Sequence, residues 1–215
     1  MENENALFDE SPSRRADYER LALAENLDYG LQFCGHRWCE NEPVAKRGRA
    51  IWEKMKIIID YWMNLPKSKR PGKGKLGANT SFDHLCIAYK DPLVPVKLQF
   101  FEDLARVLNS FLRVFQTYRP MAPFLAEELE NIIRQLCSKF IKKGVMKNAS
   151  TASRLLKIDV TKVEHQMSPN DDFDLGYGIK YELQQLKAKK KITDVQITNF
   201  KRDTIQFLAT LCGHQ

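Results

Sequence analysis

The chain has 215 residues, a mass of 25.0 kDa and a formal net charge of +7, and 43% of its residues are hydrophobic while 28% are charged. This composition is close to the average of soluble globular proteins, so it excludes a disordered, a collagen-like and a disulfide-framework chain. The polar, acidic N-terminus and the lack of a stretch of about 18 uncharged apolar residues predict neither a signal peptide nor a membrane span. We therefore expect a nuclear or cytoplasmic protein that is not secreted.

The charge is unevenly distributed along the sequence. Residues 1–42 hold 4 basic and 10 acidic side chains, whereas residues 43–91 hold 11 basic and 4 acidic ones. Residues 92–145 and 146–215 each have a net charge of +3. The positive excess is therefore concentrated in the second of these segments. The 5 cysteines are odd in number and widely spaced, which indicates reduced thiols in an intracellular protein.

The first predicted helix covers residues 43–63. Pro43 suits its first turn and Pro66 follows its end. The apolar residues recur at helical spacing, and the expected buried face is Ile51, Met55, Ile58, Ile59 and Trp62. Residues 66–75 then combine prolines and glycines with five like charges, which predicts an exposed, mobile loop.

Two long helices are predicted next, over residues 95–118 and 123–142. The first begins at Pro95, ends before Pro120 and has the apolar stripe Phe101, Leu104, Leu108, Phe111, Leu112 and Phe115. The second has glutamates near its N-terminus and lysines at its C-terminus, an order that suits the helix macrodipole. Its expected buried face is Leu125, Leu129, Ile132, Leu136 and Phe140.

The C-terminal third contains two more predicted helices. Residues 155–163 alternate weakly and fit either a short strand or an extended connector, while residues 164–176 are predicted to form a loop. A helix over 177–190 uses Ile179, Leu183 and Leu186. A terminal helix over 194–212 uses Ile197, Phe200, Thr204, Phe207, Leu208 and Leu211. The predicted fold class is therefore mostly α.

Three short patterns resemble ligand sites, and each has a simpler explanation. Residues 72–77 match a dinucleotide-binding pattern, but a charged loop precedes them instead of a buried strand. The Cys-x-His-x-x-Cys pattern of residues 34–39 has no second pair of metal ligands nearby. The acidic residues of 171–174 are typical of a solvated loop. We therefore predict no catalytic residues, no metal site and no cofactor.

Two basic clusters are more informative, the loop of residues 66–77 and the lysine run of residues 187–191. Clustered Lys and Arg side chains attract phosphates by releasing counterions. The alternatives are a solvated surface or a nuclear-import signal. The residues that we expect to contact a DNA backbone are Lys67, Lys69, Arg70, Lys73 and Lys75.

An adjacent pair, Arg37 and Trp38, precedes the first helix. A tryptophan ring beside a fixed cation can stack on an unpaired base while the cation holds the phosphate. The ring of Trp38 could equally anchor the start of the helix in the core. The residues alone leave both interpretations open.

The order of several strings resembles the Arg-Trp region and the following part of hAT-superfamily transposases, in particular the BED-finger-type and domesticated transposase-like proteins of animal genomes. These strings are Phe33-Cys34-x-x-Arg37-Trp38-x-Glu40 with Pro43-Val44-Ala45, Val96-Lys97-Leu98-Gln99-Phe100-Phe101, Arg119-Pro120-Met121-Ala122-Pro123-Phe124-Leu125, and Leu156-Lys157-Ile158-Asp159. Order and spacing carry this resemblance, which covers most of the chain.

The resemblance implies the helical insertion domain of a RNase H-like transposase with an incomplete catalytic core. In that family an Asp/Asp/Glu triad binds the metals, and by the resemblance all three carboxylates lie outside this chain, so no enzymatic activity is expected. The family's zinc-binding BED finger has no counterpart here. The resemblance also assigns Trp38 to stacking on a flipped base, with Arg37 as its neighbour. The expected organisation is an acidic segment, residues 1–42, followed by a helical domain, residues 43–215.

The leading hypothesis is thus a catalytically inactive, transposase-derived helical fragment that retains at most weak DNA binding. The alternative is a helical protein–protein interaction module whose basic runs only keep it in solution, and a weaker third possibility is an unrecognised enzyme. We expect no membrane partner and no small-molecule substrate. Since a domain separated from its catalytic core exposes the face that packed against that core, we also expect a tendency to form homo-oligomers.

Overall fold

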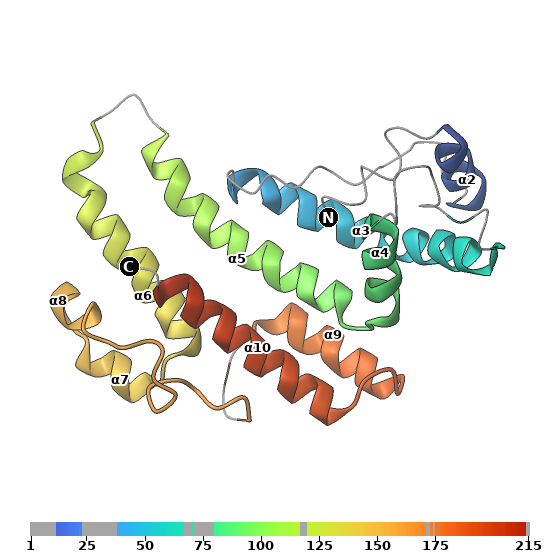
Figure 1. Cartoon of the computed structure of the whole chain (residues 1–215). Helices are drawn as coiled ribbons and strands as arrows, with labels where there is room; N and C mark the ends of the chain where they lie inside the picture. Colours follow the sequence, from blue (N-terminus) through green and yellow to red (C-terminus); the bar gives the residue numbers. More distant parts are fainter. Residues whose placement is uncertain are drawn as a thin grey trace. The chain divides into compact units, whose positions relative to one another are not determined.

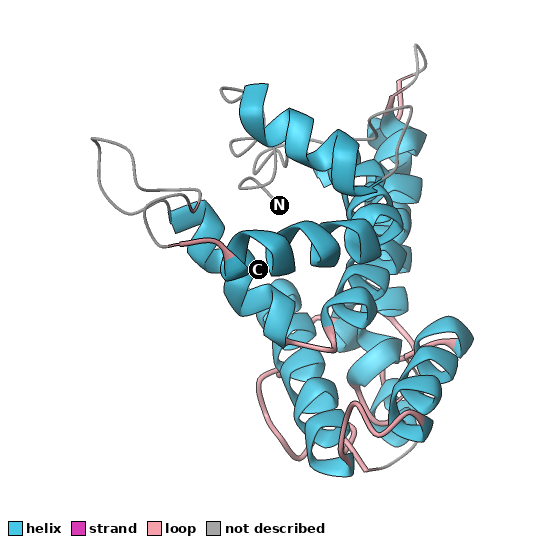
Figure 2. Ribbon diagram, turned by 90° about the vertical axis from the view of Figure 1, so that its right-hand side faces the viewer, coloured by secondary structure: helices cyan, strands magenta, loops and turns pink. Residues whose placement is uncertain are grey.

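The computed structural model describes residues 12–22, 38–66, 70, 80–116, 120–170, 173 and 175–213. These residues are mostly helical, as the sequence predicts, and no strand occurs among them (Figure 1, Figure 2). The chain divides into two compact units, Met1–Arg106 (unit 1) and Val107–Gln215 (unit 2). Within the described ranges, no helix is long and apolar enough to cross a lipid bilayer.

The described residues form nine α-helices and one 3-10 turn. In chain order they are α2 (Pro12–Ala22), α3 (Trp38–Asn64), α4 (Thr80–Lys90), α5 (Val94–Phe115), the 3-10 turn η2 (Ala122–Phe124), α6 (Leu125–Phe140), α7 (Lys143–Asn148), α8 (Ala152–Leu155), α9 (Tyr177–Ala188) and α10 (Asp194–Gly213). Helix α5 contributes residues to both units.

The core of unit 1 forms around α3, against which α2 and α4 pack. All five residues predicted for the buried face of this helix are at most 4% exposed. The rest of the cluster consists of Trp52 of α3, Tyr18 of α2, and Phe82 and Leu85 of α4. The ring of Phe82 meets that of Trp62 edge to face, with centroids 6.0 Å apart, and the Trp62 indole nitrogen donates to Asp17 at 3.2 Å. The predicted apolar face is therefore confirmed.

The helix boundaries of unit 1 differ from the prediction in two ways. Helix α3 begins at Trp38, so Pro43 lies inside the helix and not in its first turn. A proline there leaves the carbonyl of residue 39 without its helical donor. Helices α2 and α4 were not predicted, because each has only 11 residues and therefore a weak periodic signal. Packing against α3 stabilises such short helices.

Unit 2 is centred on the packing of α6 against α10. As predicted from the macrodipole, α6 has Glu127 and Glu128 in its first turn and Lys139 in its last turn. Helix α9 buries Ile179 and Leu183, which confirms two of its three predicted core residues. The buried residues of α6 and α10 are Ile132, Leu136, Cys137, Phe140, Phe200, Thr204, Ile205, Leu208, Ala209 and Cys212.

Three predictions for unit 2 were wrong in detail. Leu125 and Leu129 belong to the apolar face of α6 but are 42% and 39% exposed, because that face is covered only towards the C-terminal end of the helix. In α10, Phe207 was predicted to be buried but is 41% exposed. The buried face instead includes Ile205, Ala209 and Cys212 beside the predicted Leu208. Residues 155–163 form the end of α8 and turns, and the one described bridge, Ile141 with Gln166, is isolated.

Candidate nucleic-acid interface

Most of the residues predicted to contact DNA lie outside the described part of the chain. This holds for Arg37, Lys67, Lys69, Lys73 and Lys75, and for the side chain of Trp38, whose backbone forms the first residue of α3. The roles proposed for these side chains therefore stay predictions.

Arg70 is the one predicted contact residue whose side chain the structure describes. It is half-buried, and its Nε donates to the carbonyl oxygen of Leu65 at 2.9 Å. This carbonyl lies just beyond the C-terminus of α3. Cations near a helix C-terminus interact favourably with the helix dipole, so Arg70 has a local structural role.

A second cationic surface lies in unit 2, on residues 142–162, which we call the basic segment. The segment contains α7, α8 and the turns that follow, with six Lys or Arg residues and one acidic residue, Asp159. All of these cations are exposed: Lys142, Lys143, Lys147, Arg154, Lys157 and Lys162. The local charge is therefore strongly positive.

The cations of the basic segment, unlike many others, do not form ion pairs, although Lys162 interacts electrostatically with Asp159. None of the six forms an ion pair within the described residues. By contrast, Lys56, Lys97 and Arg106 of unit 1 pair with nearby acids, as do Arg134 and Lys187 of unit 2. An exposed cation outside any ion pair keeps its charge available to a bound anion.

Hydrogen bonds attach the basic segment to the end of α6. The Lys142 backbone nitrogen donates to the carbonyl of His165 at 2.9 Å, and that of Met167 donates to the carbonyl of Phe140 at 2.7 Å. Near the other side of α7, Arg134 Nη1 donates to the carbonyl of Ala149 at 2.8 Å. These bonds hold the cations on a folded scaffold, which reduces the entropy cost of binding.

Asp159 is the one carboxylate of the basic segment, and it accepts hydrogen bonds from Thr161 in the same turn. One oxygen accepts from the backbone nitrogen of Thr161 at 3.0 Å and from the Thr161 hydroxyl at 2.6 Å. The two donors, the hydroxyl first, lower the pKa of Asp159 below its ordinary value. Asp159 thus stabilises the turn that presents Lys162.

The described residues offer little for metal chemistry. No group of three or more His, Cys, Asp or Glu side chains in these ranges is arranged to hold a metal ion.

Comparisons with protein-family models, with curated proteins and with solved structures found no match to this chain. The function proposed below therefore rests on the residues themselves and on the sequence resemblance.

Proposed function

We propose that this chain is a non-catalytic helical module that binds the phosphate backbone of DNA through the basic segment. The observation that carries the proposal is the set of six exposed cations that form no ion pair within the described residues, on a hydrogen-bonded scaffold. Each phosphate contact releases counterions, so several contacts together give a strongly salt-dependent, sequence-independent affinity. The transposase-derived origin, the lack of enzymatic activity and the nuclear location are proposals that rest on the sequence resemblance.

The salt dependence of DNA binding tests this function. Fluorescence anisotropy of a labelled duplex would give Kd across a series of salt concentrations. If all six cations contact phosphates, log Kd should change with log salt with a slope of about 5, because each contact contributes roughly 0.9. A duplex that does not bind at low salt, or that binds with no dependence on salt, would contradict the proposal.

A matched pair of triple variants assigns the contacts to the basic segment. Neutralising Lys143, Lys147 and Arg154 to Gln should lower the slope by about 2.7, since three contacts are lost. The control neutralises Lys56, Lys97 and Lys187, which already pair with carboxylates. An equal effect of the two variants would mean that only net charge matters.

The separate variant Trp38→Ala, compared on a hairpin with an unpaired base and on a plain duplex, tests the stacking role implied by the resemblance.

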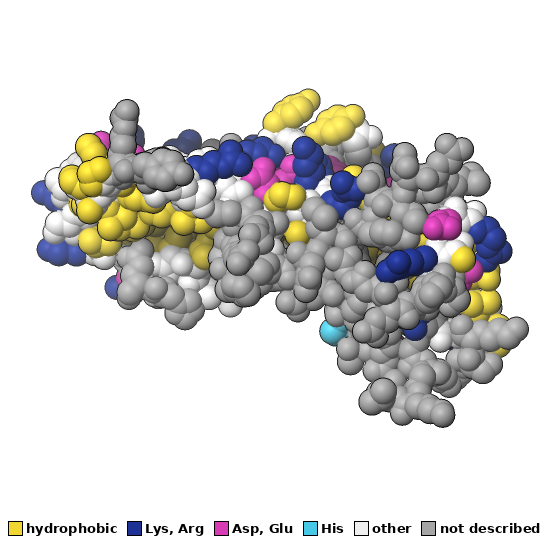
Figure 3. Space-filling view, turned by 90° about the horizontal axis from the view of Figure 1, so that it is seen from above, with side chains coloured by type: hydrophobic (Ala, Val, Ile, Leu, Met, Phe, Trp, Pro, Cys, Tyr) yellow, Lys and Arg dark blue, Asp and Glu magenta, His cyan; other side chains and the backbone are white. Residues whose placement is uncertain are grey.

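A protein–protein interaction module is the second candidate, and one observation favours it. Phe124, Leu125 and Leu129 are 52%, 42% and 39% exposed. Figure 3 shows hydrophobic side chains gathered at the left end of the viewed face. Such a patch favours association with another chain, including a second copy. Sedimentation velocity at increasing concentration should then show oligomers that depend little on salt, and Leu129→Lys should reduce them.

A further inference from the structure

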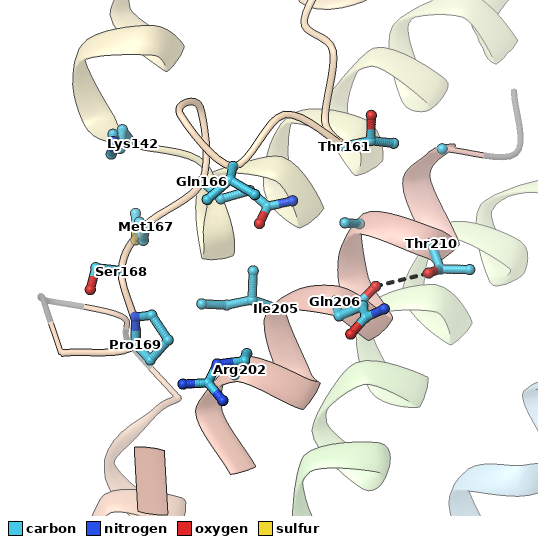
Figure 4. A pocket seen from close by; sticks show the side chains of 13 residues that line it. Lys142, Thr161, Gln166, Met167, Ser168, Pro169, Arg202, Ile205, Gln206 and Thr210 are labelled. Carbon is cyan, nitrogen blue, oxygen red and sulfur yellow. Dashed lines mark hydrogen bonds between the residues drawn. The ribbon is translucent and has the colours of Figure 1, made fainter. Parts of the chain in front are cut away.

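Unit 2 contains a pocket that the sequence analysis did not predict and that has no role in the proposed DNA binding. Its volume is about 790 Å³, which lies within the range of small-molecule sites. One side is formed by α10 between Arg202 and Gly213, and the other by the chain from Thr161 to Pro169 together with Lys142 (Figure 4). All lining residues belong to unit 2. The whole pocket therefore lies within one compact unit.

The pocket has a substantial apolar surface. Its five apolar lining side chains are Val163, Met167, Pro169, Ile205 and Ala209. Ile205 and Ala209 are 4% and 6% exposed and belong to the buried face of α10, whereas Val163 is 80% exposed. When a ligand displaces water from exposed apolar surface beside a concavity, the free energy of the complex falls. The apolar body of a small molecule would therefore be stabilised here.

Two positive charges line the same pocket. Lys142 Nζ donates to the carbonyl of Glu164 at 2.8 Å, and Arg202 Nη1 donates to the side-chain oxygen of Asn199 at 3.2 Å. Both acceptors are neutral, and neither cation forms an ion pair within the described ranges. None of the described lining residues is acidic. In Figure 4 the Arg202 guanidinium points from α10 toward Pro169, at the end of the pocket away from Lys142. The charge of the site is therefore complementary to an anion.

Hydroxyl and amide groups complete the polar part of the lining. Besides the two cations, the polar lining side chains are Thr161, Gln166, Ser168, Gln206 and Thr210. The Thr210 hydroxyl donates to the backbone carbonyl of Gln206 at 2.9 Å, so its oxygen can still accept a bond. A few convergent polar groups beside an apolar surface fix the orientation of a bound ligand.

We propose that this pocket binds a small amphipathic organic anion. The carboxylate or other acidic head of the ligand pairs with Arg202, and its apolar body covers Ile205 and Val163, while Lys142 adds positive charge at the other end of the pocket (Figure 4). This binding does not depend on the proposed DNA contacts, because Arg202 lies on α10 and outside the basic segment. Lys142 belongs to both sites and is therefore left unchanged in the tests.

The first test is isothermal titration calorimetry of the full chain with three probes. Octanoate, at concentrations at which it is monomeric, has both a charge and an apolar chain. Octanamide keeps the chain without the charge, and acetate keeps the charge without the chain. We expect octanoate to bind at least tenfold more tightly than either. Equal binding of octanamide or acetate, or no binding of octanoate, would overturn the proposal.

Two variants and one matched control assign binding to the pocket. Arg202→Gln should weaken octanoate roughly fivefold, the effect of one exposed charge contact. Arg154→Gln makes the same chemical change outside the pocket and should leave octanoate binding unchanged. Gln206→Trp places a bulky ring in the pocket from an exposed position and should abolish binding, with circular dichroism confirming the fold. Unchanged binding in Arg202→Gln would refute the assignment.

The same variants separate this inference from the proposed function. Arg202→Gln should leave the salt dependence of DNA binding unchanged, whereas the triple variant of the basic segment should lower it without affecting octanoate. If the wild-type chain does not bind DNA, the pocket proposal is unaffected. If it does not bind octanoate, the DNA proposal is unaffected.

Discussion

Helix α6 allows a comparison of two identical substitutions on one predicted apolar face. Leu136 is 6% exposed and packs in the core of unit 2, whereas Leu129 is 39% exposed. Leu136→Ala should cost about 3 kcal/mol of unfolding free energy, because it removes apolar contacts and leaves a cavity. Leu129→Ala should cost about 1 kcal/mol, since only part of its side chain is removed from water and no closed cavity forms. Helix propensity changes equally in both variants.

Thermal unfolding followed by circular dichroism measures this difference. For a unit of 109 residues, about 1 kcal/mol corresponds to roughly 4 °C in Tm. We therefore expect Tm to fall by about 12 °C for Leu136→Ala and about 4 °C for Leu129→Ala. Equal losses at high dilution would refute the described burial of α6. Equal losses only at high protein concentration would indicate that self-association covers Leu129.

The buried Glu102 side chain, 4% exposed, contacts Arg49 at 3.1 Å. Arg49→Met should cost about 1–3 kcal/mol in chemical denaturation, because the buried carboxylate keeps only its contact with Arg106 at 3.0 Å, and adding Glu102→Gln should restore part of it, because the under-compensated buried charge is removed. Burial, and to a lesser extent a nearby carboxylate, raises the pKa of the Cys86 thiol, so its alkylation rate, followed by peptide mass spectrometry, should still rise above pH 9. Because the pKa of Asp159 is lowered, its stabilising contribution is present above the ordinary carboxyl pKa and is lost as the pH falls through the lowered value. Thr161→Val should raise this pKa in an NMR titration; an unchanged midpoint would contradict the hydroxyl contact.

The sequence predicted helices well where apolar periodicity is long. The buried face of α3 was predicted correctly because five large apolar residues recur over three turns. Periodicity shows which side of a helix is apolar, but it does not show whether another element covers that side. Leu125 and Leu129 are exposed for this reason, although they continue the face of Leu136 and Phe140. The short helix α4 depends on packing against α3 and was missed.

The basic segment could not be identified from the sequence by counting charge. Its cations are spread over 21 residues, and the boundary between residues 145 and 146 used in the charge count divides it. More importantly, the sequence does not show which cations find a carboxylate. Lys187 pairs with Asp194 at 2.5 Å, whereas Lys143 and Lys157 have no such partner among the described residues. The pocket likewise depends on the approach of a loop to α10, and no local pattern predicts it.

Protection of lysines from acetylation tests most directly whether DNA binds the basic segment. The full chain would be acetylated with and without a DNA duplex at low salt, and each lysine quantified by peptide mass spectrometry. We expect protection of Lys143, Lys147, Lys157 and Lys162, with Lys56 and Lys97 reacting equally in both samples. Protection confined to residues 67–75, or no protection at a DNA concentration that saturates binding, would contradict this expectation.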